Sequence, residues 1–271
     1  NAYLGISKIE KSLSLYHEAL DILNKNPEKN IVNIAITNNN IGNVYFLQKN
    51  YNKALDFYNI ALDIYKKYLG EENRYFAGTL ANIGIVYNKN GDNLKAYEYH
   101  KKALSIELHI YGENHPDVAN TLNNLGITYE RLGKLDKSIE SHEKSLKIRK
   151  KILGENSIQV ANSLLNLGTI RGVQKEYDKA LDNFIEAQRI YEKNNKENDK
   201  NYALIGIHIG AILCDLDRHD EAIPFFEKSE SILSKNFTDD HSNLKMVKKL
   251  LNNARKISMF KSHDLNGLEK L

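Results

Sequence analysis

One glycine recurs through this chain at a constant interval of 42 residues. The five copies are Gly42, Gly84, Gly126, Gly168 and Gly210. Two columns of small residues keep the same interval, the first at Ala54, Ala96, Ser138, Ala180 and Ala222, the second at Ala61, Ala103, Ser145, Ala187 and Ser229. Self-similarity at a fixed period of this length predicts an array of repeated supersecondary units, each of which buries its apolar face against its neighbours.

Each repeat has the pattern of two helices joined by a short polar turn. Residues 54–65 place apolar side chains at steps of three and four, which is helical spacing. A glycine follows the second helical run at Gly70, Gly112 and Gly154, where it can end a helix with φ above zero. Glycine inside a helix costs about 1 kcal/mol relative to alanine, so the repeated glycine needs a packing reason. We expect it and the first small residue to let the paired helices approach closely, and the second small residue to face the next repeat.

These columns, with Tyr45, Tyr87 and Tyr129 three residues after the glycines, resemble the tetratricopeptide repeat. Residues 111–119 and 122–126 resemble the kinesin-light-chain type of this repeat. The usual unit has about 34 residues, and the present one is longer by about eight. The resemblance covers nearly all of the chain and implies an all-α, right-handed superhelical solenoid of tandem antiparallel helix pairs. HEAT and armadillo repeats have comparable periods but do not place glycine, tyrosine and alanine at these offsets.

The periodicity predicts a single solenoid over residues 1–271. It comprises a partial repeat at 1–30, full repeats at 31–72, 73–114, 115–156, 157–198 and 199–240, and a C-terminal capping helix and tail at 241–271. We expect the chain to be a piece of a longer protein, because its start matches the second helix of a repeat. The last helix is expected over 242 to about 257, followed by either a continued helix or a frayed tail. The polar linker 193–200 lacks the glycine stop and is predicted to be the most flexible connection.

Composition argues against several classes of function. With 38 basic and 35 acidic residues the chain lacks the basic excess typical of nucleic-acid binding. No apolar run approaches the roughly 20 residues that span a membrane, and one cysteine, Cys214, fits a reducing, cytoplasmic location. The sequence has no phosphate-binding glycine loop and no metal or catalytic constellation. We therefore expect no enzyme activity, no cofactor, no metal and no small-molecule substrate.

Asparagines supply the candidate binding residues. In tetratricopeptide arrays the first helix of each repeat lines a concave groove, and the position two residues before each glycine lies in it. Here that position holds Asn40, Asn82, Asn124, Asn166 and His208, and Asn43 and Asn123 occupy nearby groove positions. A carboxamide offers both a donor and an acceptor, so such a ladder can bind the backbone of an extended peptide. The alternative is that each asparagine bonds to a neighbouring helix and only shapes the array.

Two further features modify the predicted groove. Lys89 and Arg131 follow their glycines by five positions, so they are either a cationic spot for an acidic ligand or two solvated charges. Leu165, Ile207, Leu204 and Val173 make the C-terminal half more apolar and suited to an anchoring side chain. The sequence thus predicts a non-catalytic module that binds an extended peptide, in the manner of a kinesin-light-chain-like adaptor or scaffold. A sensor or regulatory arm of a larger enzyme or switch is the alternative, and a structural spacer is a third option.

Overall fold

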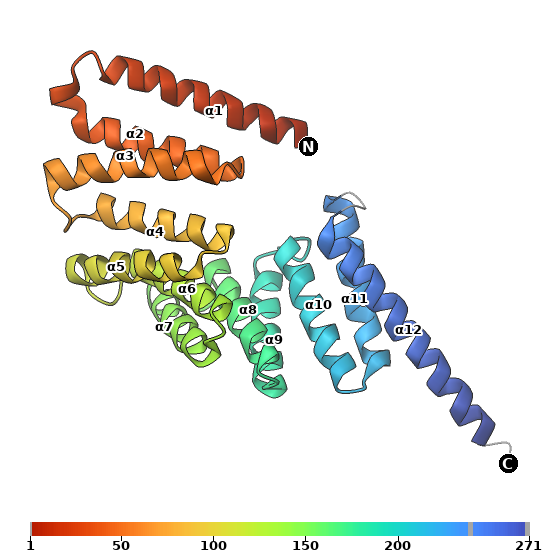
Figure 1. Ribbon diagram of the computed structural model, residues 1–271. Coiled ribbons are helices and arrows are strands. Elements are labelled where there is room, and N and C mark those ends of the chain that lie inside the picture. The colour runs from red at the N-terminus through yellow and green to blue at the C-terminus, as the bar shows by residue number, and fades with distance from the viewer. Residues whose placement is uncertain (1, 238–240, 269–271) are drawn as a thin grey trace. The chain divides into compact units, whose positions relative to one another are not determined.

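A computed structural model describes the backbone of residues 2–237 and 241–268 and the side chains of 9–237 and 241–261 (Figure 1). The described backbone is helical and contains no strand. Its helices are α1 (Ala2–Leu23), α2 (Pro27–Leu47), α3 (Tyr51–Leu69), α4 (Arg74–Asn90), α5 (Asn93–Tyr111), α6 (Pro116–Arg131), α7 (Leu135–Leu153), α8 (Ile158–Val173), α9 (Tyr177–Lys193), α10 (Lys200–Asp215), α11 (His219–Asn236) and α12 (Ser242–Leu268).

The helices pack in consecutive pairs, as the repeat predicts. The full repeats hold the pairs α2/α3, α4/α5, α6/α7, α8/α9 and α10/α11, and we call the members of each pair its first and second helix. The first full repeat begins at Pro27, four residues before the predicted boundary. Of the two expectations for the residues after 257, the structure has the continued helix, since α12 extends to Leu268. The chain divides into an N-terminal unit, residues 1–148, and a C-terminal unit, residues 149–271. The division falls inside α7 rather than at the linker 193–200.

The repeated glycine makes room for a ring on the second helix. A Cβ atom built at Gly126 would lie 2.6 Å from the imidazole of His142, and one built at Gly168 would lie 2.7 Å from the ring of Phe184. The same contact recurs in every full repeat, and the rings belong to Tyr58, His100, His142, Phe184 and Phe226. The close approach predicted from the small residues is therefore filled by a side chain sixteen positions after each glycine.

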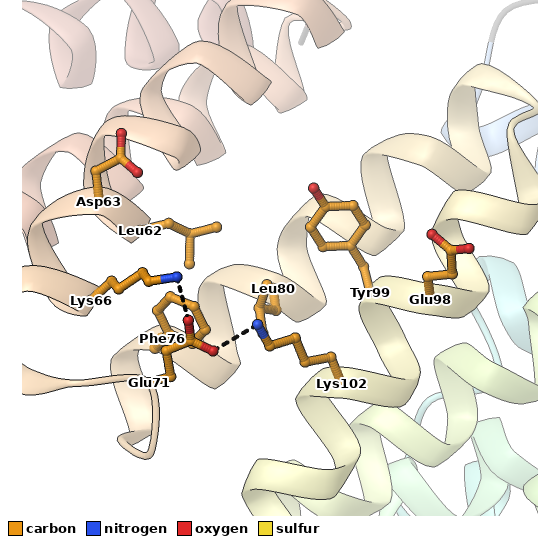
Figure 2. A pocket seen from close by; sticks show the side chains of 9 residues that line it. All are labelled: Leu62, Asp63, Lys66, Glu71, Phe76, Leu80, Glu98, Tyr99 and Lys102. Carbon is orange, nitrogen blue, oxygen red and sulfur yellow. Dashed lines mark ion pairs between the residues drawn. The ribbon is translucent and has the colours of Figure 1, made fainter.

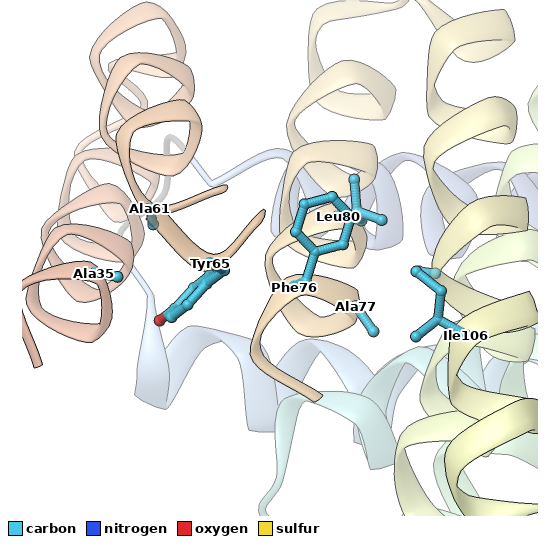
Figure 3. Close-up of a cluster of buried hydrophobic side chains, with 8 residues drawn as sticks. Ala35, Ala61, Tyr65, Phe76, Ala77, Leu80 and Ile106 are labelled. Carbon is cyan, nitrogen blue, oxygen red and sulfur yellow. The ribbon is translucent and has the colours of Figure 1, made fainter. Parts of the chain in front are cut away.

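The small-residue columns are buried throughout, with exposed fractions of 0–1%. Serine replaces alanine where its hydroxyl can donate to a backbone carbonyl of the first helix: Ser138 bonds to Gly126 at 2.9 Å and Ser145 to Ala119 at 2.7 Å. In the N-terminal unit Ala61 lies in a buried cluster with Ala35 of its own repeat and Ala77 of the next (Figure 3). The second small residue therefore contacts both repeats, which links neighbouring pairs into one core.

Turns inside the repeats share one backbone conformation. The residue seven positions after each glycine has φ between 60° and 85°, and it is Lys49, Gly91, Gly133, Lys175 or Asp217. Only two of these five are glycines, although non-glycine residues pay about 1–2 kcal/mol for left-handed backbone. The glycines that end α3 and α5, Gly70 and Gly112, also have positive φ. Backbone geometry thus follows the repeat even where the residue type does not.

Asparagine replaces the missing glycine stop in the linker 193–200. The Asn194 side-chain amide donates to the carbonyl of Ile190 at 2.8 Å and to that of Asn156 at 2.9 Å, which ties the end of α9 to the preceding loop. Asn236 makes the equivalent pair of bonds one repeat later, to Ile232 and Asn198. The flexibility of this linker stays a prediction. Movement of the end of α9 away from the loop at Asn156 would break the Asn194 bond to that loop. Pro224 lies at the sixth position of α11, and the helix continues through it.

Candidate peptide-binding face

In the N-terminal unit the predicted asparagines lie on adjacent first helices. Asn82 on α4 donates from its amide nitrogen to the side-chain oxygens of Asn39 and Asn43 on α2, each at 3.3 Å. Asn39 also accepts from the hydroxyl of Thr79 at 3.1 Å. These bonds hold α2 and α4 side by side along the asparagine positions. We call the surface of α2, α4 and α6 that carries Asn40, Asn82 and Asn124 the first-helix face.

The bonds on the first-helix face use only part of each carboxamide. The side-chain oxygen of Asn43 accepts both from Asn82 and from the Tyr58 hydroxyl, the latter at 2.7 Å. The amide nitrogen of Asn43 and the side-chain oxygen of Asn82 form no hydrogen bond among the described residues. A network of this kind orients the amides and leaves one donor and one acceptor for another molecule. The inter-helix bonding that was the alternative for the asparagine ladder is thus present at Asn82 and Asn43, and peptide binding by the remaining atoms stays a prediction.

Asn40 and Asn124 are half-buried, and their side chains bond to no other side chain in the described part of the chain. The backbone carbonyl of Asn124 accepts from the hydroxyl of Thr128 at 2.8 Å, so the residue lies in regular helix. Asn123, beside it, takes part in interactions within the chain. Asn40 and Asn124 are therefore the ladder members whose carboxamides are most available to a ligand.

Of the two predicted cations, Lys89 belongs to the last turn of α4 and Arg131 of α6 bonds to the same turn. The Arg131 guanidinium donates to the backbone carbonyl of Asn88 at 3.0 Å, next to Lys89 in sequence. The amide of Asn88 in turn donates to Thr128 at 2.8 Å, which fixes α6 against α4. Lys89 is exposed. Arg131 thus stabilises the carbonyl end of α4, and a cationic spot shared with Lys89 stays a prediction.

In the C-terminal unit the side chains at the equivalent positions differ in burial and in contacts. Asn166 is half-buried and takes part in interactions within the chain. His208 stacks on Phe184, with ring centroids 5.3 Å apart and planes at 6°, and burial lowers the pKa of His208. Leu165 and Ile207 were expected as exposed anchoring residues, but only 8% and 2% of them is exposed. They belong to the core, so the predicted apolar anchor there reduces to the half-buried Leu204 and the exposed Val173.

Two buried ionisable groups on α5 escaped the sequence analysis. His100 is fully buried against Gly84, neither ring nitrogen has a partner in the described residues, and burial lowers its pKa to about 4. Glu107 is 3% exposed and accepts a hydrogen bond from Thr121, and burial raises its pKa to about 7. The signal that could have marked them as core residues is their position in columns where tyrosine, phenylalanine or leucine stands in three of the five repeats.

The described residues hold no grouping of three or more His, Cys, Asp or Glu side chains suited to a metal ion. Among the helices of the described region, none combines the length and the apolar character that crossing a membrane requires. The thiol of Cys214 is half-buried, and burial raises its pKa, which disfavours the reactive thiolate.

Comparison with known proteins identifies the repeat. The family model described as tetratricopeptide repeat matches residues 1–67, 75–151 and 129–193. The fold is similar to BtubC (BKLC) from P. vanneervenii, with TM-score 0.65 and 19% identity over 90% of this chain and 92% of that one. It is also similar to a putative kinesin light chain from Podosopora anserina with nearly identical TPR-like repeats. The TM-score there is 0.63 and the sequence identity 16%, over 73% of this chain and 94% of that one.

A further solved structure with this fold is a protein complex, the APC/C hetero-tetramer Cut9–Hcn1. Its TM-score is 0.68 and its identity 18%, over 93% of this chain and 41% of that chain. No curated protein matches the sequence. At these identities the structural neighbours establish the fold alone.

Proposed function

This chain belongs to the tetratricopeptide repeat family, and we propose that it is a non-catalytic adaptor or scaffold whose first-helix face binds an extended peptide of a partner protein. Repeats of this family mediate protein–protein interaction. The neighbours that carry the kinesin light chain name and the Cut9–Hcn1 complex support a role in assembling proteins. The peptide is the finer part of the proposal, and its support lies in the first-helix face.

The proposal rests on which asparagine side chains of the first-helix face still have atoms without a hydrogen-bond partner among the described residues. Asn40 and Asn124 stand at the same repeat position, are half-buried and have no side-chain partner in the described residues. Asn82, between them, is oriented by two bonds to α2 while its oxygen remains available. A peptide backbone presents alternating donors and acceptors, which a row of amides can satisfy whatever the peptide's side chains are. Asn123, Asn166 and His208 remain predicted contacts of the same kind.

Lys89 and Arg131 give the site a preference for acidic ligands. The bond from Arg131 to the carbonyl of Asn88, the residue before Lys89, supports a shared cationic spot at this end of α4. A ligand carboxylate would form charge-assisted hydrogen bonds with them. The backbone contacts thus supply general affinity, and the two cations supply selectivity.

The test begins with selection of peptide ligands from a displayed library and then compares variants. Asn40→Ala and Asn124→Ala should each weaken every selected peptide by about 0.5–1.5 kcal/mol, the value of one neutral hydrogen bond, or roughly two- to thirteenfold in Kd. Asn52→Ala and Asn59→Ala are matched controls, because these asparagines are exposed on the second helix α3. Circular dichroism verifies folding. Equal affinities for all four variants and wild type would overturn the proposal.

A further inference from the structure

A cleft between the second helices α3 and α5 lies apart from the first-helix face. Its volume is about 370 Å³. Leu62 of α3, Tyr99 of α5 and the α4 residues Phe76 and Leu80 provide its apolar lining (Figure 2). Phe76 and Leu80 are 4% and 3% exposed, so the floor of the cleft is the core of the N-terminal unit.

A charged bridge crosses one end of this cleft. Glu71 pairs with Lys66 of α3 at 2.6 Å and with Lys102 of α5 at 2.8 Å, and hydrogen bonds to the two lysines lower the pKa of Glu71 to about 2. The Lys102 ammonium also lies 5.2 Å from the centre of the Phe76 ring. Figure 2 shows the three side chains meeting in front of Phe76. The two lysines thus already hold one carboxylate, with which a ligand carboxylate would have to compete.

The other two charged residues of the cleft have no such partner. Asp63 on α3 and Glu98 on α5 are exposed, and neither forms an ion pair within 4 Å among the described residues. Figure 2 shows them on the two flanking helices, outside the bridge. Asp63 still lies near enough to Lys66 to help raise the pKa of that lysine. Counting the bridge, the cleft combines an apolar floor with three carboxylates and two lysines, a net charge of −1.

The equivalent cleft of the C-terminal unit shows that this combination is not a consequence of the repeat. It lies between α9 and α11, 126 residues later, and its volume is about 180 Å³. There Tyr202 replaces Phe76, and its hydroxyl accepts from Gln188 at 2.9 Å and from Lys228 at 2.7 Å. The positions of Asp63 and Glu98 are taken by Arg189 and Pro224. A cleft recurs at this place in the repeat, but the open volume and the acidic walls belong to the α3/α5 cleft.

We infer that the α3/α5 cleft is a second docking site, which takes a peptide segment of a partner protein in which an apolar side chain is followed by a basic one. The apolar side chain contacts Leu62, Leu80 and Tyr99, and the basic side chain pairs with Asp63 and Glu98. An acidic ligand would instead have to displace Glu71 from two ion pairs. The charge preference is opposite to that proposed for the first-helix face, so the two sites select different segments.

The probes for this inference are three short peptides in a Gly/Ser background that differ only at a central pair, Phe-Arg, Phe-Glu or Ser-Arg. Binding is followed through the methyl NMR signals of Leu62 and Leu80 in the full chain. We expect the Phe-Arg peptide to shift both signals at micromolar to millimolar concentration and the other two peptides to leave them in place. Failure of Phe-Arg to shift them, or equal shifts with Phe-Glu or Ser-Arg, would overturn the inference.

A second experiment removes the two carboxylates proposed to bind the basic side chain. The double variant Asp63→Asn/Glu98→Gln should weaken the Phe-Arg peptide roughly two- to thirtyfold, the effect of two surface ion pairs. The matched control Asp56→Asn/Glu113→Gln removes two exposed carboxylates that do not line the cleft and should bind as wild type does. Equal loss in both variants would indicate attraction by net charge only and would contradict a docking site. Asn124→Ala should leave Phe-Arg binding unchanged, so this outcome is independent of the function proposed for the first-helix face.

Discussion

In the N-terminal unit the rings packed against the repeated glycines of α4 and α6 are imidazoles, whereas in the C-terminal unit the equivalent rings are phenyl groups. His100 and His142 occupy the positions that Phe184 and Phe226 occupy later in the chain. The contact distances are nearly the same, since a Cβ on the facing glycine would lie 2.6–2.7 Å from the ring in all four cases. The repeat therefore fixes the shape of this core position and leaves its polarity free.

The same contrast extends to the faces of the two units. The first helices of the N-terminal unit carry a bonded and partly unoccupied asparagine network, whereas Leu165 and Ile207 of the C-terminal unit are buried at positions where asparagine or alanine stands earlier. Polar groups at these positions add little to stability, because burying them costs solvation that their bonds only partly return. We therefore assign recognition mainly to the N-terminal unit.

The largest expected effect is on the pH dependence of stability, and it comes from two separately buried ionisable residues of α5, His100 and Glu107. The pKa of His100 falls from 6.5 to about 4 on folding, so the unfolded chain binds more protons between these values and stability is lost as the pH falls. The pKa of Glu107 rises from 4.5 to about 7, so the folded chain binds more protons and stability is lost as the pH rises. Each shift corresponds to about 3 kcal/mol, and the two dependences oppose each other between pH 4.5 and 6.5.

Single variants should separate these opposing effects. Relative to wild type, His100→Phe should gain about 3 kcal/mol of stability as the pH falls from 6.5 to 4, and Glu107→Gln should gain a similar amount as it rises from 4.5 to 7. Urea unfolding at a series of pH values measures both differences. Ser105→Ala is the control, because this serine is exposed on the same helix and carries no titratable group. If the stability difference between His100→Phe and wild type were equally independent of pH, the contrast between imidazole and phenyl rings in the two units would be contradicted.

The next effect tests the glycine–ring contact. Gly126→Ala places a Cβ 2.6 Å from the His142 ring and should destabilise the chain by about 1–3 kcal/mol through overpacking. Gly78→Ala is the matched substitution, because Gly78 lies in α4 with no atom within 4 Å of the added Cβ. It should stabilise the chain by about 0.5–1 kcal/mol, since alanine favours the helix. Thermal melting compares the two, and a change of the same sign in both would remove the steric explanation.

A smaller effect is expected at the turns within repeats. Lys175 adopts φ of 62°, and Gly133 adopts φ of 71° at the equivalent position. Lys175→Gly should therefore stabilise the C-terminal unit by about 1 kcal/mol, and Gly133→Lys should destabilise the N-terminal unit by a similar amount. Chemical unfolding of both variants measures the two changes in the free energy of unfolding. Destabilisation by Lys175→Gly would show that its side-chain contacts outweigh the backbone cost.

The smallest expected effect concerns charge selection on the first-helix face. Lys89→Ala should weaken acid-bearing ligands by about 0.2–1 kcal/mol, and the loss should diminish as salt increases. Neutral ligands should bind Lys89→Ala as they bind wild type. Titration at low and high salt with an acidic peptide and its amide counterpart gives the result. A loss that persists at high salt would mean that Lys89 acts through packing rather than charge.

Sequence predicted the helix pairs, the small-residue columns and the order of the repeats, because period and steric size can both be seen in residue letters. It did not predict the rings facing the glycines, because tyrosine, histidine and phenylalanine have similar shapes but different chemical classes. Burial of Leu165 and Ile207 was also missed, since a position exposed in one repeat can be covered in another. The sequence predicted that Asn82 lies on the binding face, but its bonds to α2 depend on the spacing between helices, which no motif encodes.

The central claim is that a peptide lies along the asparagines of α2, α4 and α6, and side-chain amide NMR signals observe these groups directly. Titration of the ¹⁵N-labelled chain with a selected peptide should shift the amide signals of Asn40, Asn82 and Asn124, assigned by single substitution. The signals of Asn52 and Asn59, exposed on α3, should stay in place. Movement of the α3 signals alone, or saturable binding with no change at Asn40, Asn82 and Asn124, would contradict the account.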